Sequence, residues 1–206
     1  MADNQNLPPQ DSKTTTKHEK HDGGQNTNSK TVDSSSGHAA SPEAVYLAAK
    51  QLLASDVKGA VAKFRELSDA GCAFASFRLA SLFFHSNCVR KDLPEAIRNA
   101  RLAVDQGHLV APTLLALIEE RYAEAFAKGQ CLVTDIDCKR VAPRVDERSE
   151  AYFYLGRLYD FGHGVDQSDA EAVRWYEKAI AEDDHPIALF NLGQAYRTGD
   201  GVKKDS

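Results

Sequence analysis

Apolar residues recur at helical spacing in two stretches of the chain that nearly repeat each other. The first stretch places Ala151, Leu155 and Tyr159 at i, i+4 and i+8, which forms one apolar stripe along a helix. The second restates this stripe from Ala188 to Tyr196, 37 residues further along the chain. A fixed period of this length is typical of a solenoid, in which a core forms only when successive units stack.

Each unit is predicted to be a pair of helices joined by a turn. Gly162 and Gly164 follow the first stripe and can adopt the backbone conformations with which a helix ends. Ser168 and Glu171 then form a capping box, which predicts the start of a second helix. Gly156 leaves room on the first helix for the second to approach closely. The second helix carries apolar residues on helical spacing: Ala172, Trp175, Tyr176 and Ala179.

These residues resemble the Sel-1-like repeat family, a relative of the tetratricopeptide repeats with a longer turn between its helices. The resemblance is strongest over 151–202 and is carried by two segments: Ala151-x3-Leu155-Gly156-x2-Tyr159-x2-Gly162-x-Gly164-Val165 and Ala172-x2-Trp175-Tyr176-x-Lys178-Ala179. Ser168 departs from the Asp that the family usually has there, and both residue types cap helices. The resemblance implies an all-α, right-handed superhelical solenoid of helix-hairpin repeats.

The chain outside the clear repeat divides into a polar tail and further units. Residues 1–41 contain no Phe, Tyr, Trp or Ile, which predicts a disordered tail, and the solenoid is expected over 42–206. One unit is expected to be degenerate, with a single first helix from about Val110 to Lys128 and an irregular loop over 129–148. The hairpins are expected at about 42–72, 73–108, 109–148, 149–185 and, incompletely, 186–206.

The last unit ends before its second helix. A first helix alone leaves an apolar side uncovered, whereas solenoids cap their ends with polar faces. The favoured interpretation is that the sequence is a fragment of a longer array. Alternatively, another molecule covers this helix, or the chain associates with itself through it.

Composition and charge narrow the range of partners and locations. The formal net charge is −5 and there is no run of five or more basic residues, which argues against nucleic acid as the main partner. No apolar stretch approaches the ~18 residues that span a bilayer, which argues against direct membrane insertion. The N-terminus lacks the layout of a secretory signal. A cytoplasmic protein is therefore expected.

Few residues indicate catalysis or a bound metal. The sequence contains no Gly-rich phosphate loop after a strand, no nucleophile elbow and no paired-acid motif. His85 and Cys88 have a spacing found in metal sites, but no second pair follows at the distance of a zinc site. The four cysteines are expected to be buried free thiols. No catalytic residue, cofactor or metal site is predicted, and the chain is not expected to be an enzyme.

The same resemblance implies that the first helices line a concave surface that binds partners. It places eight side chains on that surface: Phe77, Phe84, Phe153, Arg157, Phe161, Phe190, Gln194 and Arg197. Phe77, Phe153 and Phe190 share one position of the repeat, so they either form an aromatic ladder along the groove or merely pack between neighbouring repeats. Arg157 and Arg197 could meet acidic or carboxyl-terminal groups of a peptide.

The predicted function is a non-enzymatic adaptor or scaffold that holds a partner protein or peptide on its concave face and regulates a complex. This prediction follows from the resemblance alone, since a fold does not by itself define a function. The alternative is that the chain is the N-terminal fragment of a larger enzyme or regulatory protein whose catalytic part lies beyond residue 206.

Overall fold

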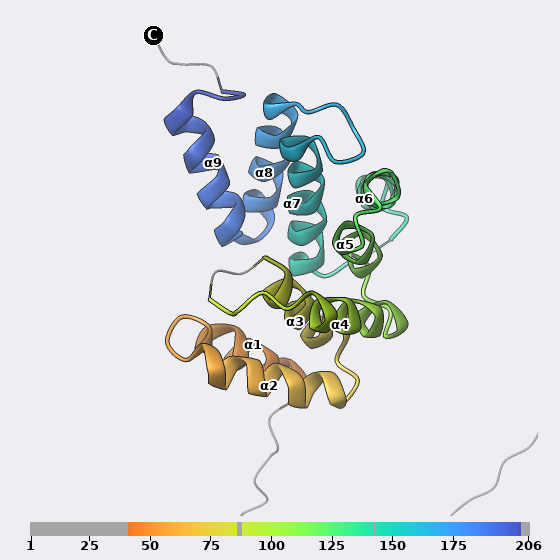
Figure 1. Ribbon diagram of the computed structural model, residues 1–206, viewed down its shortest axis with the longest axis vertical. Coiled ribbons are helices and arrows are strands. Elements are labelled where there is room, and N and C mark those ends of the chain that lie inside the picture. The colour runs from red at the N-terminus through yellow and green to blue at the C-terminus, as the bar shows by residue number, and fades with distance from the viewer. Residues whose placement is uncertain (1–40, 86–87, 142, 203–206) are drawn as a thin grey trace, which may run out of the picture. The chain divides into compact units, whose positions relative to one another are not determined.

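The computed structural model describes residues 41–85, 88–141 and 143–202 (Figure 1). The predicted disordered tail over 1–41 lies outside the described residues, except for Ser41. Within them the protein is all-α, with no strand. The helices are α1 (Pro42–Leu52), α2 (Val57–Asp69), α3 (Ala73–His85), α4 (Leu93–Asp105), α5 (Ala111–Ile118), α6 (Tyr122–Asp137), α7 (Val145–Phe161), α8 (Asp169–Asp183) and α9 (Pro186–Thr198).

The helices pack in the order in which they occur along the chain. α1 pairs with α2, α3 with α4, α5 with α6 and α7 with α8, and each of these hairpins contacts the next. α9 packs on α8 and stands at the edge of the array (Figure 1). The predicted all-α solenoid of helix-hairpin repeats is therefore confirmed.

A glycine on α7 allows a close helix pairing. A Cβ atom at Gly156 would lie 2.8 Å from the ring of Tyr176 and 3.3 Å from the main-chain oxygen of Ala172, both on α8. The Tyr176 hydroxyl donates a hydrogen bond of 2.8 Å to Asp160 and so fixes the ring against α7. The expected role of Gly156, to admit the second helix, therefore has a direct structural basis.

The second glycine of each turn packs against the helix hairpin before it. Gly164 has φ +76°, and a Cβ there would lie 2.3 Å from the main-chain oxygen of Tyr122 at the start of α6. Gly201, with φ +70°, is in the same relation to the main chain of Asp169 at the start of α8, at 2.4 Å. Only glycine combines this backbone conformation with so close an approach. The two turns therefore join neighbouring repeats as well as the two helices of one repeat.

The predicted structure of the degenerate unit is wrong. In place of one helix over 110–128 and a loop over 129–148, the chain forms the short helix α5 and the longer helix α6. The break falls at Glu120, whose φ of +57° is left-handed. The Glu120 N–H donates to the Leu117 carbonyl (3.2 Å) and the Arg121 N–H to the Ala116 carbonyl (2.8 Å). These are the two hydrogen bonds of a Schellman C-cap, formed here without the usual glycine.

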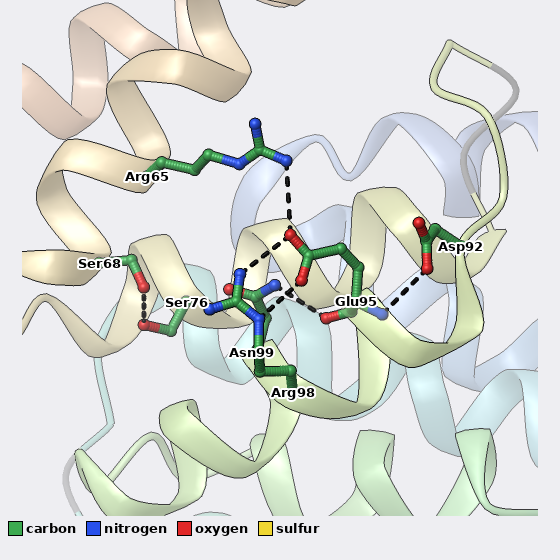
Figure 2. A network of polar contacts seen from close by, with 7 residues as sticks. All are labelled: Arg65, Ser68, Ser76, Asp92, Glu95, Arg98 and Asn99. Carbon is green, nitrogen blue, oxygen red and sulfur yellow. Dashed lines mark hydrogen bonds and ion pairs between the residues drawn. The ribbon is translucent and has the colours of Figure 1, made fainter.

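Polar side chains join the second hairpin to the first. Figure 2 shows Arg65 of α2 reaching Glu95 of α4, at 3.4 Å. Asp92 accepts the main-chain N–H of Glu95 at 3.1 Å and caps α4. Ser68 of α2 and Ser76 of α3 share a buried hydrogen bond of 2.7 Å. The exposed ion pair contributes little to stability, whereas the buried hydroxyl pair satisfies two polar groups between the helices.

We expect opposite effects from alanine at two equivalent glycines. Gly156→Ala should lower the free energy of unfolding by about 1–2 kcal/mol, because overpacking against Tyr176 outweighs the gain in helix propensity. Gly193→Ala, at the same position of α9, meets nothing within 4 Å and should raise the free energy of unfolding by up to about 1 kcal/mol. Chemical denaturation of both variants measures the difference. Equal effects at the two positions would contradict the packing described here.

Candidate functional site

The first helices of three hairpins and the start of α9 surround an apolar hollow, here called the inner cleft. Its two adjoining parts have volumes of about 410 and 450 Å³ and share Leu53, Arg78, Cys88, Pro186 and Ile187. The first part is lined by Leu53, Arg78, Ser81, Leu82, His85, Cys88, Pro186, Ile187 and Phe190. The second part extends to α7, through Ser149 and Glu150, and to the end of α8, through Asp183.

A buried chain of charged groups forms the floor of the inner cleft. Arg78 Nη1 lies 3.2 Å from Glu150 Oε1, and His185 Nε2 lies 3.4 Å from Glu150 Oε2. The side chain of Arg78 is 17% exposed and those of Glu150 and His185 are 7% exposed. Burial opposes the ionisation of Glu150, but Arg78 and His185 outweigh it and hold the pKa of this carboxyl at about 2. Glu150 is therefore ionised at neutral pH and balances the charge of Arg78.

His185 links this floor to the start of α9. Its Nδ1 accepts the main-chain N–H of Ala188 at 3.2 Å, which caps the helix. A ring nitrogen that accepts carries no proton, so the other nitrogen, Nε2, is the one that donates toward Glu150. A single imidazole therefore connects α7 to the start of α9, in addition to the packing of α9 on α8.

Helices distant in sequence meet at the rim of the inner cleft. Lys50 Nζ of α1 lies 3.2 Å from Asp183 Oδ2 of α8, and both side chains are more than one third exposed. An ion pair this exposed adds little stability. The Lys50–Asp183 pair nevertheless shows that the first and fourth hairpins approach each other across the cleft.

Two buried polar atoms at the inner cleft have no hydrogen-bond partner among the described residues. They are Arg78 Nε and His85 Nδ1. Burial, together with the neighbouring charge of Arg157, lowers the pKa of His85 to about 3, so its ring is neutral at physiological pH. Buried polar groups are normally paired, and an unpaired group beside a hollow is a position at which a ligand atom can bind.

The structure contradicts two of the predicted partner-binding residues. Phe77 is 3% exposed and Phe153 is fully buried, so neither ring is presented to a partner. Phe77 stacks on His108, with ring centroids 4.1 Å apart, and Phe153 stacks on His185 at 4.3 Å. Each histidine belongs to the turn that leads into the next hairpin. These phenylalanines therefore pack between repeats, which is the alternative that their shared position had left open.

The remaining predicted residues lie at several separate places. Arg157 lies over Phe161, with its guanidinium carbon 5.4 Å from the ring centroid, and Phe161 is 56% exposed. Gln194 and Arg197 are joined by a hydrogen bond of 2.8 Å and line a second hollow, between α7, α8 and α9. The half-buried Phe84 lies beneath Lys91. Of the eight predicted residues, Phe190 alone lines the inner cleft, and it is 65% exposed.

The sequence did not single out the residues of the charged floor. Arg78 and Glu150 are far apart in the sequence and neither belongs to the quoted repeat pattern. The signal in the sequence is weak: Arg78 is a lone charged residue in the otherwise apolar segment 73–84, whereas Glu150 follows the charged residues Glu147 and Arg148. Only the stacking of the hairpins shows that these two positions meet.

The described residues provide no group of His, Cys, Asp or Glu side chains that could hold a metal ion. Within the same part of the chain, Cys72, Cys131 and Cys138 are free thiols. Cys131 and Cys138 are exposed and Cys72 is half-buried, so the expectation of buried thiols is wrong. Within 41–85, 88–141 and 143–202, every helix falls short of the length and hydropathy needed to cross a membrane.

Comparison with known proteins identifies the repeats. Residues 73–108, 149–184 and 186–206 match the model of the Sel1 repeat, and these segments coincide with the hairpins α3–α4 and α7–α8 and with α9. The chain therefore contains Sel1 repeats over these residues, and the resemblance found in its sequence is confirmed. Sel1 repeats are typically modules of protein–protein interaction and are generally not catalytic.

Among curated proteins, the chain is similar to the ERAD-associated E3 ubiquitin-protein ligase component HRD3B of Arabidopsis thaliana. The two are 43% identical over 51 residues, which is 25% of this chain and 8% of the relative. The chain therefore matches only a small part of that protein's length.

Two solved structures are also similar. One is the Sel1 repeat protein from Oxalobacter formigenes, with 21% identity and a TM-score of 0.41 over 80% of this chain and 68% of that one. The other is c5321, a protective antigen of uropathogenic Escherichia coli with an SLR fold. It has 18% identity and a TM-score of 0.38 over 79% of this chain and 42% of that one.

Truncation of the two equivalent phenylalanines should have very different effects. Phe153→Ala removes a fully buried ring and should lower the free energy of unfolding by about 3–5 kcal/mol. Phe190→Ala removes a ring that is 65% exposed and should change it by no more than about 0.5 kcal/mol. Urea denaturation followed by circular dichroism tests both variants. A stable Phe153→Ala protein would show that this ring is not part of the core.

Acidification should destabilise the protein through His108. Burial lowers the pKa of its ring to about 4, and its Nδ1 accepts the Val110 N–H at 3.3 Å. In the unfolded chain the imidazole of His108 takes up a proton below about pH 6.5, whereas in the folded chain it does so only near pH 4. Stability therefore falls as the pH drops through this window, by about 2 kcal/mol from this residue at pH 5.

The variant His108→Asn separates this contribution from that of other groups. It should be less stable than the wild type at pH 7, because the stack on Phe77 is lost. Its further loss between pH 7 and pH 5 should nevertheless be smaller, by about 2 kcal/mol. Equal losses in the two proteins would rule out a buried neutral His108.

Proposed function

We propose that the chain is a non-enzymatic adaptor whose inner cleft holds an extended segment of a partner protein. The observation that carries this proposal is the combination of open apolar walls with an unpaired polar atom on the floor. Ile187 and Phe190 are 37% and 65% exposed on one side, and Arg78 Nε has no partner among the described residues. Such a hollow offers burial to an apolar side chain and a hydrogen bond to the main chain beside it.

The charge of the floor favours a peptide main chain over a strongly charged ligand. Glu150 already pairs with Arg78, so the guanidinium keeps a donor but little unbalanced charge. A backbone carbonyl can accept from Arg78 Nε without the cost of burying another ion. The apolar side chain of the same segment would pack against Leu82, Ile187 and Phe190, which line one part of the cleft.

The comparisons support the general role and leave the partner open. HRD3B is a component of an E3 ubiquitin-protein ligase, and the similarity covers 25% of this chain. This supports a place for the chain within a larger protein assembly. Three statements remain predictions: that nucleic acid is not the main partner, that the protein is cytoplasmic, and, as the alternative, that it is part of a larger enzyme.

Selection of peptides from a random phage-displayed library on the full chain tests the cleft. We expect the selected peptides to share an apolar anchor residue and to bind in fluorescence anisotropy. Ile187→Asp should weaken this binding at least tenfold, because it places a carboxylate on the apolar wall near Glu150. Leu93→Asp is the matched control, since Leu93 is 42% exposed at the start of α4 and lines none of the hollows described above.

Circular dichroism and thermal melting should be nearly unchanged in both variants, because both positions are partly exposed. Selected peptides that bind Ile187→Asp as tightly as the wild type would show that the inner cleft is not the binding site. A library that yields no binding peptide would also count against the proposal.

A further inference from the structure

A third hollow, here called the turn hollow, lies between the first hairpin and the second. It has a volume of about 340 Å³, and its walls include Val57, Lys58, Val61 and Arg65 of α2 and Val89 and Arg90 of the turn before α4. Both walls belong to described parts of neighbouring hairpins. The turn hollow therefore does not depend on where the sequence begins or ends.

The turn hollow exists because one residue departs from the repeat pattern. Cys88 follows Ala75 at the same distance at which Gly164 follows Ala151. A Cβ at Gly164 would lie 2.3 Å from the main-chain oxygen of Tyr122, so the glycine turn rests directly on the hairpin before it. Cys88 carries a Cβ and is not among the described non-glycine residues with positive φ. Its turn therefore cannot approach α2 as closely, and a space remains between them.

The floor of the turn hollow is aliphatic. Val57 and Val61 lie about one helical turn apart on α2, and Val89 joins them from the turn. All three are half-buried, and Val61 and Val89 pack against the hydrophobic core. An aliphatic side chain placed on this floor would lose contact with water, which favours binding in proportion to the apolar area that is buried. The described residues that line the hollow include no aromatic ring on which a nucleic-acid base could stack.

Exposed cations surround this floor. Lys58, Arg65 and Arg90 line the turn hollow, and no acidic residue is among its described lining residues. Within the described part of the chain, Lys58 and Arg90 form no ion pair. Arg65 pairs with Glu95 at 3.4 Å, but this carboxylate lies closer to Arg98, at 2.7 Å (Figure 2). The rim of the hollow is therefore positively charged, although the chain as a whole has a formal net charge of −5.

We propose that the turn hollow binds an extended segment of a partner protein in which an aliphatic residue is flanked by acidic residues. The aliphatic side chain packs on Val57, Val61 and Val89. The carboxylates on either side of it pair with Lys58 and Arg90, which lack an acidic partner in the described structure. Charge pairs at an exposed rim select the partner and speed its association more than they add affinity. The apolar contact supplies most of the affinity.

This site is additional to the inner cleft, whose floor favours an uncharged main chain. Cys88 lines both hollows, so the variants that test the proposal are made at Lys58 and Arg90, which line the turn hollow and not the inner cleft. Both side chains are exposed. Their substitution should therefore leave the fold intact.

The probe is a fluorescein-labelled peptide with the sequence Gly-Glu-Glu-Leu-Glu-Glu-Gly and blocked ends. Fluorescence anisotropy with the full chain should give saturable binding with a dissociation constant on the order of 10–100 μM. A peptide with serine in place of leucine should bind at least fivefold more weakly, and so should one with glutamine in place of every glutamate. Raising the salt concentration from about 50 to about 300 mM should weaken binding at least threefold.

The decisive variant of the protein carries both Lys58→Glu and Arg90→Glu. Peptide affinity should fall at least tenfold, while circular dichroism and thermal melting stay nearly unchanged. The matched control carries Lys139→Glu and Arg140→Glu, because these exposed residues after α6 give the same change in net charge on the third hairpin. The control should bind at least threefold more tightly than the decisive variant.

Two further measurements separate this site from the inner cleft. Ile187→Asp should bind the acidic peptide as the wild type does. Peptides selected for the inner cleft should bind normally to the protein that carries Lys58→Glu and Arg90→Glu. Failure of one site therefore leaves the other testable.

Four results would overturn the proposal. They are no saturable binding of the acidic peptide, equal affinity of the wild type and the decisive variant, and equal affinity of the leucine and serine peptides. The fourth concerns nucleic acid as the occupant. A single-stranded DNA oligonucleotide that binds more tightly than the peptide, and that the decisive variant no longer binds, would assign the turn hollow to nucleic acid instead.

Discussion

The stack between a turn histidine and a phenylalanine of the preceding first helix joins the second hairpin to the third and the fourth hairpin to α9. His185 packs on Phe153 of α7, accepts the N–H that caps α9, and faces Glu150 with its other nitrogen. His108 likewise stacks on Phe77, and its Nδ1 accepts the N–H of Val110, the residue that precedes α5. Because one rigid ring touches both the helix behind it and the helix ahead, it sets the angle between neighbouring repeats.

The architecture could be predicted from the sequence because each helix carries its own period and its own start and stop residues. The third hairpin could not, since the left-handed residues that follow its two helices, Glu120 and Lys139, are not glycines. The two C-caps are made of main-chain hydrogen bonds alone, so no residue type in the sequence indicates where these helices end. A propensity for continued helix over 110–128 was overridden by this local geometry.

The candidate site was harder to predict than the fold, and the three equivalent phenylalanines show why. Phe77, Phe153 and Phe190 occupy one repeat position, yet two are buried and one is 65% exposed. The difference is whether a histidine of the following turn covers the ring, and the position of the phenylalanine in the repeat does not indicate this. The contact between Arg78 and Glu150 likewise arises from the stacking of hairpins that are distant in sequence. Repeat positions indicate which residues are equivalent but not what surrounds them.

The position of α9 at the edge of the array has a consequence for local motion. In a linear array each unit is held by its own folding energy and by the interfaces on its two sides, and α9 packs chiefly on α8. Its amide hydrogens should therefore exchange with solvent sooner than those of α7, because local opening there breaks fewer contacts. A helix packed against the exposed face of α9 would add contacts that this local opening has to break, so hydrogen exchange within α9 would slow.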